Sequence, residues 1–369
     1  MSGATSESTS RPMSGPVISS TLTDGIVTLR DSTPSDVPDL LAGRDDQRRR
    51  FLGLGSDEPQ PSFCIVAEGE VTGWVDYDRH PDHSWLGGDE VNVGYELFPA
   101  FRGRGLATRS LQLMLHHLAV RGEHRVASLL IDPMNAPSLA LATRVGFAAS
   151  GEIGDQRYFR RVIPPLRYTD SVVEIRPQRP DDLERHLSAI DDAQIDWLWL
   201  PGERELWEAM TPERQRQHQL EYLRTSQATF GQGPKWRFSA DAGDEQYVAY
   251  IDCDLANPDV PAGEANIAYV THPSFRRRGF ASRAVLLMLA FLADHTGARE
   301  AHLVIDAEND DSTRVAGGVG TYERERFVGR DGRVKVRYVV EITRPWQQWS
   351  TSTVRPARDA HITPSSSTP

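Results

Sequence analysis

The sequence predicts an α/β protein made of two similar domains in tandem, each with a mixed, twisted β-sheet flanked by helices. The chain has 369 residues, which is enough for two domains with a core each. Short apolar runs of strand length alternate with longer runs at helical spacing, a pattern typical of α/β domains. One stretch of the first half also returns in the second half, which indicates an internal duplication.

The duplication is centred on PAFRGRGLATR at residues 99–109, which returns as PSFRRRGFASR at residues 273–283. The offset of 174 holds without a gap from Asn92/Asn266 to Gly146/Gly320. Roughly two in five of the paired residues are identical, which is far more than two unrelated segments would share. The chain therefore contains two copies of one unit.

The first strands of the two copies, residues 26–30 and 172–176, are offset by 146 instead of 174, so the second copy carries 28 more residues. The additional segment includes the aromatic run 195–200 and a helical run at 212–223. Its tryptophans fit two interpretations, a wall for a substrate or ordinary packing, because large aromatics mostly serve burial. They are Trp197, Trp199 and Trp207.

The remaining elements follow one order in both copies: a hairpin, the strand before the repeated stretch, a helix, an apolar strand, a short helix and a closing hairpin. In copy one they are 63–68 with 71–77, 91–98, 111–118, 127–131, 138–145 and 148–163, and a short helix and loop at 45–61 precede them. In copy two they include 236–241 with 247–253, 285–292, 301–305 and 322–342. Gly297 is expected to stop the second long helix, and Glu90 and Glu264 to be solvated at the strand starts.

The repeated stretch lies between a strand and a helix and has the chemistry of a diphosphate site. The first turn of a helix presents free N–H donors, and the helix dipole favours negative charge there. Gly103 and Gly105 let the backbone approach a ligand closely. Arg102 and Arg104 can add charge-assisted hydrogen bonds.

These residues resemble the acyl-CoA pyrophosphate loop, R/Q-x-x-G-x-G/A, of the GNAT N-acetyltransferases. Residues 135–138, NAPS, followed by VGF at 145–147, resemble the N-x-x-S…G-F segment of that family. Copy two has NDDS at 309–312 and VG at 319–320, with Thr321 in place of the usual Phe. The resemblance covers both halves of the chain, and it is closest to the subgroup of ribosomal-protein N-terminal acetyltransferases.

The resemblance implies acetyl-CoA as the co-substrate, no metal, and backbone N–H contacts near Leu97 and Thr271 to the thioester carbonyl. It places the cofactor on both loops and on the two asparagines that precede the short helices. The residues implied are Leu97, Arg102, Gly103, Arg104, Gly105, Leu106, Ala107 and Asn135 in copy one, and Thr271, Arg276, Arg277, Arg278, Gly279, Phe280, Ala281 and Asn309 in copy two.

The catalytic groups depart from the family pattern. Many members use a Tyr four residues before the Gly of G-F as the acid, and Ala142 and Ala316 stand there, so Ser138 and Ser312 are the substitutes. The frequent Glu is replaced by Asn92 and Asn266. Glu96, on the same strand face as Asn92, is the candidate base of copy one. Copy two has Val270 at the position of Glu96, with His272 nearby. Copy one is therefore expected to be the better-equipped catalyst. Alternatively, an amine that enters the site already deprotonated needs no base.

The net charge of −11 disfavours a nucleic-acid-binding role and suits a cationic acceptor. No apolar run approaches the length of a membrane helix, and Met1 to Ser20 lacks the pattern of a secretion signal, so we expect a cytoplasmic protein. Cys64 and Cys253 are expected to be buried, reduced thiols.

The sequence thus predicts disordered tails at 1–20 and 351–369 and GNAT domains at 22–168 and 171–346. The expected activity is acetyl-CoA-dependent N-acetylation of a primary amine, on a small cationic metabolite or drug or on a protein N-terminus. A tandem acetyltransferase similar to mycothiol synthase, and a non-catalytic acyl-CoA-binding sensor or scaffold, remain the alternatives. The sequence leaves the oligomeric state open.

Overall fold

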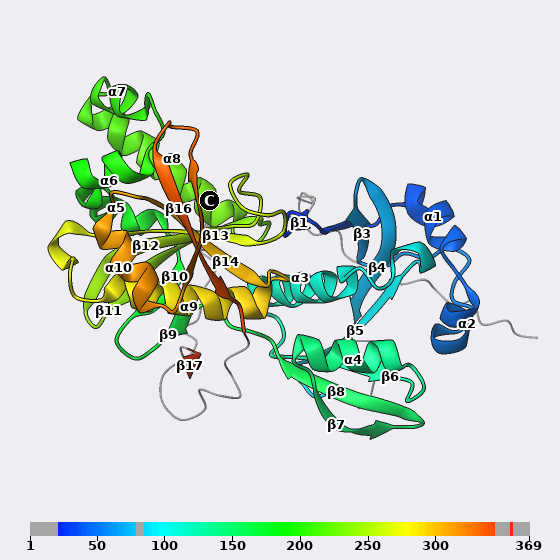
Figure 1. The fold of residues 1–369 in the computed structure, drawn as a ribbon. Coiled ribbons are helices and arrows are strands. Elements are labelled where there is room, and N and C mark those ends of the chain that lie inside the picture. Colours follow the sequence, from blue (N-terminus) through cyan, green and yellow to red (C-terminus); the bar gives the residue numbers. More distant parts are fainter. Residues whose placement is uncertain (1–20, 79–84, 344–354, 357–369) are drawn as a thin grey trace, which may run out of the picture.

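The computed structural model describes residues 21–78, 85–343 and 355–356, and it contains two α/β domains that lie side by side (Figure 1). Within these residues the first sheet has eight strands in the order β1-β2-β3-β4-β5-β6-β8-β7, and the second has nine in the order β15-β16-β14-β13-β12-β11-β10-β9-β17. Both sheets are mixed, because a single parallel pair, β5/β6 or β13/β14, lies among antiparallel pairs. The predicted fold class is confirmed.

Domain 1 contains the elements of copy one in the expected order. They are β1 (Leu22–Thr23), β2 (Thr28–Asp31), α1 (Val37–Ala42), α2 (Asp46–Leu52), β3 (Phe63–Ala67), β4 (Glu70–Asp78), β5 (Glu90–Leu97), α3 (Leu106–Arg121), β6 (Val126–Ile131), α4 (Ala136–Val145), β7 (Ala148–Ile153) and β8 (Gln156–Val162). Helix α3 begins after Gly105 and ends at Gly122, two residues that take left-handed backbone conformations.

Domain 2 repeats this order and adds helices between its first strand and its first hairpin. Its elements are β9 (Tyr168–Thr169), β10 (Glu174–Pro177), α5 (Leu183–Ala189), α6 (Asp192–Leu198), α7 (Glu203–Glu208), α8 (Pro212–Thr229), β11 (Lys235–Ala242), β12 (Glu245–Asp254), β13 (Ala265–Thr271), α9 (Phe280–His295), β14 (Glu300–Asp306), α10 (Asp310–Gly318), β15 (Tyr322–Val328), β16 (Val334–Glu341) and β17 (Arg355–Pro356). The predicted additional helical run is confirmed as α8.

Each domain has its own core, built from its central helix and the face of the sheet beneath it. In domain 1, Leu111, Met114 and Leu115 of α3 are fully buried against the sheet. In domain 2, Val285 and Met288 of α9 hold the places of Leu111 and Met114. Cys64 and Cys253 are buried free thiols, as the sequence predicts.

Several expectations need correction. The helices α3 and α9 begin five residues earlier than the apolar pattern indicated, directly after the glycine of each loop. Glu90 is not solvated, because it is 1% exposed and bonds to Tyr158 and Arg160. Glu264 accepts hydrogen bonds from two backbone N–H groups, those of Arg299 and Glu300.

The chain passes from one domain to the other through a proline segment, Pro164 and Pro165, and β9 directly after it already pairs with β10 in the second sheet. Residue 168, the predicted end of domain 1, therefore belongs to the second sheet. Residues 1–20, 344–354 and 357–369 lie outside the described residues. Within the predicted C-terminal tail, Arg355–Pro356 pair with β9 as β17.

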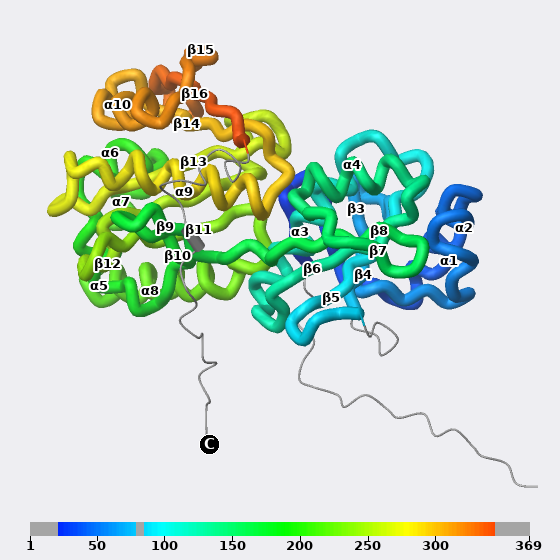
Figure 2. The backbone as a smooth tube through the Cα atoms, turned by 90° about the horizontal axis from the view of Figure 1, so that it is seen from below, coloured from blue at the N-terminus to red at the C-terminus, as the bar shows by residue number. Residues whose placement is uncertain are grey.

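The two domains meet where α3 and α9 come together (Figure 2). Arg161 of β8 forms an ion pair with Asp294 of α9, and Tyr168 donates a hydrogen bond to the same carboxylate. The guanidinium of Arg109 donates to the carbonyl of Gly263 across the interface. A Cβ on Gly297 would collide with Arg109, so this glycine makes room for domain 1 and is not the stop of α9, which ends at His295.

A chain of buried rings crosses the same interface. The Nε2 of His295 lies 3.0 Å from the carbonyl oxygen of Pro165, which can only accept, so this nitrogen carries the proton. Burial lowers the pKa of His295 well below its usual value, so the ring is neutral and its Nδ1 accepts from the Nδ1 of His116 at 3.1 Å. The Nε2 of His116 lies 3.2 Å from the indole nitrogen of Trp236 and 3.3 Å from the carbonyl oxygen of Phe230. Because the Nδ1 of this neutral ring carries its proton, Nε2 accepts from the indole N–H and donates nothing to Phe230. Three hydrogen bonds thus run in one direction from Trp236 to Pro165.

Candidate functional site

Each domain presents an uncapped helix N-terminus at its repeated loop. Gly105 and Gly279 precede α3 and α9 with φ of 80° and 78°, a left-handed conformation that favours glycine. No side chain caps either helix start, so the first-turn N–H groups keep their hydrogen-bonding capacity. A Cβ at Gly103, Gly105 or Gly279 would meet open space. The geometry expected of an anion site is therefore present twice.

The first arginine of each loop is bound to protein groups. Arg102 donates from Nε to the carbonyl of Leu97 at 2.9 Å, and its Nη1 lies 2.6 Å from Asp45. Arg276 repeats this with the carbonyl of Thr271 at 3.3 Å and with Asp191 at 2.7 Å. Both carboxylates also cap a helix, α2 or α6. These arginines join the strand end to the neighbouring helix, and their expected contact with phosphate stays a prediction.

The other arginines of the loops differ between the domains. Arg104 pairs with the exposed Glu68, and Arg278 lies over the ring of Phe275. Arg277 has a φ of 63°, a conformation that side chains other than glycine rarely adopt, at the position that Gly103 holds in domain 1. Within the described residues its side chain has no ion pair or hydrogen bond, and it lines a cavity described below.

The central strands separate beside each loop. β5 pairs with β6 from Glu90 to Asn92 only, although β5 continues to Leu97. β13 pairs with β14 at Ala265 and Asn266 only and continues to Thr271. The remainder of each strand has an edge without a strand partner among the described residues. Such an edge can offer backbone N–H groups to a carbonyl or an oxyanion.

The short helices after the apolar strands begin with the expected Asn and Ser. Asn135 and Asn309 accept a hydrogen bond from the backbone N–H of Ser138 and Ser312, at 3.3 and 3.0 Å. These asparagines therefore cap α4 and α10. Their contact with the cofactor and the acid role of the serines stay predictions.

A pair of tyrosines that the sequence reasoning missed lies beside these serines. Tyr95 on β5 and Tyr269 on β13 occupy the same repeat position, and the hydroxyl of Tyr269 donates to the carbonyl of Ser312 at 3.2 Å. Burial raises the pKa of Tyr269 to about 12 and also raises the pKa of Tyr95. The constant offset of 174 could have drawn attention to them, since both copies keep a Tyr there.

Domain 2 contains a cavity of about 480 Å³ in the wedge between β13 and β14. Its wall includes the start of α9, the Ser312 end of α10 and the inner side of α6. The residues that line it include Asn266, Tyr269, Arg277, Gly279, Ser312 and Trp197. The repeated loop and the additional segment of copy two thus border one space.

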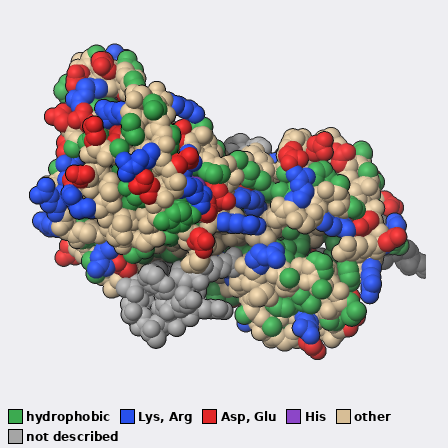
Figure 3. Space-filling view, in the orientation of Figure 1, with side chains coloured by type: hydrophobic (Ala, Val, Ile, Leu, Met, Phe, Trp, Pro, Cys, Tyr) green, Lys and Arg blue, Asp and Glu red, His purple; other side chains and the backbone are tan. Residues whose placement is uncertain are grey.

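The tryptophans of the additional segment divide between the two interpretations. Trp197 lines the cavity, and the guanidinium of Arg333 lies 5.7 Å from its ring centre. Trp199 and Trp207 pack edge-to-face on each other with ring centres 5.5 Å apart. Acidic and basic side chains intermix on the outer surface over α7 and α8 (Figure 3), where Arg204 pairs with Asp192 and Asp196.

Domain 1 carries a buried carboxylate where domain 2 has Val270. Glu96 is 5% exposed, and its Oε2 accepts from the indole of Trp74 at 2.7 Å and lies 3.3 Å from Nε of Arg48. Its Oε1 is buried without a hydrogen-bond partner among the described residues. Burial raises the pKa of Glu96. A carboxylate with one free oxygen and a raised pKa is suited to accept a proton.

The other candidate base, His272, is held by its neighbours. Its Nδ1 accepts from the N–H of Ser274, so its Nε2 carries the proton and faces Ser188 at 3.1 Å. It is absent from the residues that line the cavity.

Asn92 and Asn266 each have a buried side-chain oxygen without a partner among the described residues, and Asn266 lines the cavity.

Comparison with protein families identifies both halves. Residues 28–147 match the model of the acetyltransferase (GNAT) family, and residues 173–321 match that of the acetyltransferase (GNAT) domain. Together the matches cover well over half of the chain. The chain belongs to the GNAT acetyltransferase family. As a tandem GNAT protein it has one family domain on each side of the proline segment.

Individual relatives are distant. The ribosomal-protein-serine acetyltransferase of Escherichia coli is 26% identical over 117 residues, which are 31% of this chain and 63% of that protein. Among solved structures, a GNAT-family acetyltransferase from Bacillus anthracis is 16% identical, with 48% of this chain and 98% of that chain covered and a TM-score of 0.37. Mycobacterium smegmatis RimJ in complex with CoA-disulfide is 17% identical over 47% of this chain and 85% of that chain, with a TM-score of 0.36.

The described residues contain no helix that is both long enough and apolar enough to cross a membrane.

Proposed function

We propose that the protein is an N-acetyltransferase that moves the acetyl group of acetyl-CoA to a primary amine, with a reaction site in each domain. The observation that carries the proposal is the cavity of domain 2. It joins an uncapped helix start, an unpaired strand edge and the hydroxyl of Tyr269 to a wall supplied by α6. Family membership and the activity of the E. coli relative support the same chemistry.

The diphosphate of CoA would bind the first-turn N–H groups of α9 in domain 2 and of α3 in domain 1, where the helix dipole favours negative charge. Arg277 adds a positive charge in domain 2. From the loop, the pantetheine arm would enter the wedge between the separated strands. Backbone N–H groups near Thr271 and Leu97 would then stabilise the oxyanion that forms during transfer.

The leaving thiolate requires a proton. The hydroxyl of Tyr269, whose pKa burial raises to about 12, is protonated at neutral pH and would donate to sulfur in place of its bond to the carbonyl of Ser312. Tyr95 has the same place in domain 1. Ser138 and Ser312 remain the alternative donors, and Ser312 also lines the cavity.

The amine must lose a proton before or during its attack. In domain 1 we propose Glu96 as the base, because its unpartnered Oε1 and raised pKa suit this role. Trp74 and Arg48 hold the other oxygen and so fix the carboxylate. Domain 2 lacks a carboxylate at this position, since Val270 replaces it.

For the acceptor we propose a cationic amine, since a net charge of −11 attracts positive substrates. A small metabolite or drug and a protein N-terminus both fit this description. The expected location in the cytoplasm would give access to both.

The test is a panel of amine acceptors in which release of the free CoA thiol is followed. The single variants Gly105→Glu and Gly279→Glu each place a carboxylate at one anion site, so each should silence one domain, and the double variant should be inactive. Gly105→Asn and Gly279→Asn are matched controls, because Asn tolerates the left-handed conformation without adding charge. Two CoA sites by calorimetry with no transfer to any amine would instead identify an acyl-CoA-binding sensor.

A further inference from the structure

Helix α6 forms a wall of the domain 2 cavity at the wide end of the wedge. β13 and β14 pair only at Ala265 and Asn266, so the space between them is widest where they end, at Thr271 and Asp306. Both of these strand ends line the cavity, and so does one face of α6. The lining residues of that face are Ala193, Gln194, Trp197 and Leu198.

Within the described residues, arginines bond both ends of α6 to the sheet. At its start, the aspartate that caps α6 pairs with Arg276, which also donates to the carbonyl of Thr271. Near its end, the Nη1 of Arg333 donates to the carbonyl of Asp196 at 2.5 Å and lies 3.3 Å from the buried carboxylate of Asp306. Helix α6 therefore spans the wide end of the wedge, from the end of β13 to the end of β14.

Arg333 connects two walls of the cavity. Its guanidinium lies 5.7 Å from the ring centre of Trp197, in a cation–π contact, and pairs with Asp306 on the other side. Both partners line the cavity, whereas the side chain of Arg333 is 48% exposed. Lys335 also pairs with Asp306, so this buried carboxylate keeps a cationic partner when Arg333 is replaced.

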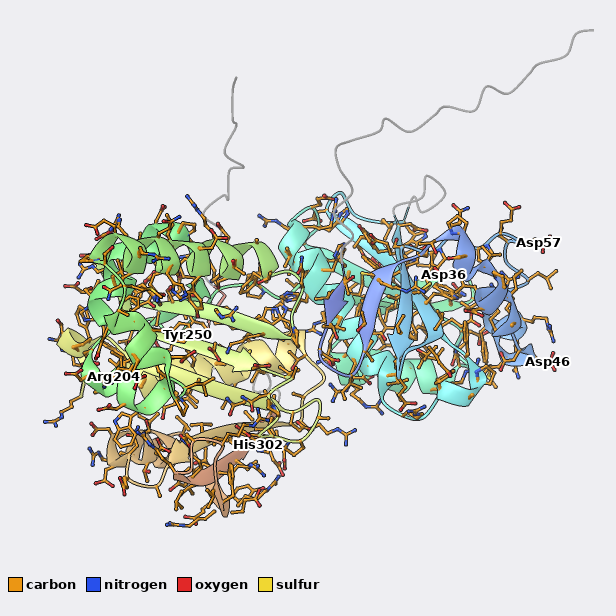
Figure 4. All side chains as sticks on the ribbon, turned by 90° about the horizontal axis from the view of Figure 1, so that it is seen from above. Asp36, Asp46, Asp57, Arg204, Tyr250 and His302 are labelled. Atoms are coloured by element: carbon orange, nitrogen blue, oxygen red, sulfur yellow. The ribbon has the colours of Figure 1, made fainter. Side chains whose placement is uncertain are left out.

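Helix α7 supports α6 from the face opposite the cavity. The guanidinium of Arg204 on α7 lies 3.1 Å from Asp192 and 2.7 Å from Asp196, and both aspartates lie on the α6 face away from the lining residues. Trp199 and Trp207 pack on each other between the same segments. Arg204 is on the side of domain 2 that faces away from domain 1 (Figure 4). The wall over the wedge is thus two helices thick.

Domain 1 provides an internal comparison. Helix α2 holds the place of α6, and Arg102 bonds its start to the end of β5 as Arg276 does in domain 2. However, α2 is followed by β3 without a helix that corresponds to α7. The turn between β7 and β8 has two residues, Gly154 and Asp155, whereas that between β15 and β16 has five and carries Arg333. The thick wall and its second arginine therefore distinguish domain 2.

We propose that domain 2 acetylates small primary amines, and that Arg333 determines this specificity by holding α6 over the wedge and so excluding peptide N-termini. This inference rests on the proposed acetyltransferase function and selects one of its two acceptor classes for this domain. The cavity of about 480 Å³ would have to hold the pantetheine arm as well as the acceptor, so little space is left while the wall is in place. Arg333 acts through α6 and is therefore a positioning residue.

The experiment uses the full chain with Gly105→Glu, so that turnover reports domain 2, and it follows release of the CoA thiol. The acceptors are propylamine, 1,4-diaminobutane and the tetrapeptide Ser-Ala-Ala-Ala with a free N-terminus. The parent should acetylate the small amines in preference to the tetrapeptide. Arg333→Ala should raise kcat/KM for the tetrapeptide by about 10-fold through a lower KM, with kcat for the small amines and the calorimetric Kd for CoA unchanged.

Two further variants make the test specific. Arg330 lies in the same turn and pairs with Asp259 at 3.7 Å, so Arg330→Ala is the matched control and should keep the parent's preference. Trp197→Ala removes the ring against which Arg333 lies, and it should admit the tetrapeptide as Arg333→Ala does.

The outcomes separate this proposal from the one on which it rests. If the Gly105→Glu parent transfers acetyl to no acceptor, the domain 2 function fails and the size selection fails with it. If the parent acetylates the tetrapeptide as well as the small amines, the acetyltransferase stands and the selection is wrong. A parent selective for small amines whose preference survives in Arg333→Ala, or an Arg333→Ala chain with weakened CoA binding, would overturn the role of Arg333.

Discussion

The two domains share the geometry of their proposed cofactor loops but differ on the sheet face that we propose meets the acceptor. In domain 1, Glu96 lies between Trp74 and Arg48 on that face. In domain 2, Val270 and Tyr250 occupy the matching register positions. The hydroxyl of Tyr250 bonds to Asp252 of the same strand. The carboxylate that we propose as the base of domain 1 therefore has no counterpart at this position in domain 2, although the strand lies in a corresponding sheet.

The shared parts show what the fold itself requires. In both domains an arginine joins the end of the central strand to an aspartate that caps the next helix, as Arg102 does with Asp45. Both domains also keep a left-handed glycine before the long helix. These features shape the loop and expose the helix N–H groups. The two copies thus keep the geometry of the proposed anion site and differ at the proposed base.

The largest effect is expected from a charge at the loop. Gly279→Glu should remove one of two CoA sites, and Gly105→Glu the other, because a carboxylate at the helix start repels the diphosphate. The affinity of the altered site should fall by more than about 10²-fold in isothermal titration, with the second site unchanged. A wild-type chain with a single CoA site would break the comparison, because one copy would then have lost its cofactor.

The next effect concerns the base of domain 1. In a Gly279→Glu chain the remaining turnover should depend on Glu96, and Glu96→Gln should lower kcat by about 10²–10⁴-fold while CoA affinity stays nearly unchanged. Ser138→Ala should lower kcat less, since water can replace a hydroxyl. These kcat values are measured from steady-state rates with the amine that the Gly279→Glu chain acetylates fastest. An unchanged kcat in Glu96→Gln would show that domain 1 uses another base or a neutral amine.

A smaller effect is expected at the interface that joins the domains. The pKa of His116 is about 4 in the folded chain and about 6.5 in an unfolded one, so the unfolded state binds more protons below pH 6.5. Stability should be constant above that pH and fall toward pH 4, with a loss at pH 5 of about 2 kcal/mol from this group. Urea unfolding at pH 7.5 and 5.0 measures the loss. His116→Gln should show a smaller pH dependence, and an equal dependence would contradict the assignment.

The smallest effect separates the two loops. Arg277 adopts a left-handed conformation that costs about 1 kcal/mol, and Gly103 takes the same place without that cost. Arg277→Gly should raise the free energy of unfolding by about 1 kcal/mol and weaken CoA binding in domain 2 several-fold. Gly103→Arg in domain 1 should lower the free energy of unfolding and strengthen CoA binding in that domain. A more stable Arg277→Gly chain with unchanged CoA affinity would mean that the strained arginine does not serve the cofactor.

The fold was predictable because each of its signals is local. Hairpins, buried strands and helices have their own spacing, and the offset of 174 doubles each observation. Even so, the apolar spacing did not indicate the first turns of α3 and α9, because these turns contain polar as well as apolar residues.

The site was predictable only in part, because its contacts join distant residues. The partners of Arg102 and Arg276, Asp45 and Asp191, lie 57 and 85 positions away, so nothing in the motif indicates that these arginines are already bound. The wedge that holds the cavity depends on the register of β13 with β14, and no spacing rule gives that register. The offset could have identified Tyr269, but its neighbour Ser312 is known only from the folded chain.

The one-directional chain of rings between the domains has a consequence for spectroscopy. Its protons, on the indole of Trp236 and the imidazoles of His116 and His295, are fully buried, so they can exchange with solvent only when the interface opens. In nuclear magnetic resonance these N–H signals should appear at low field and exchange slowly. Their exchange rate therefore reports how often the interface between the two domains opens.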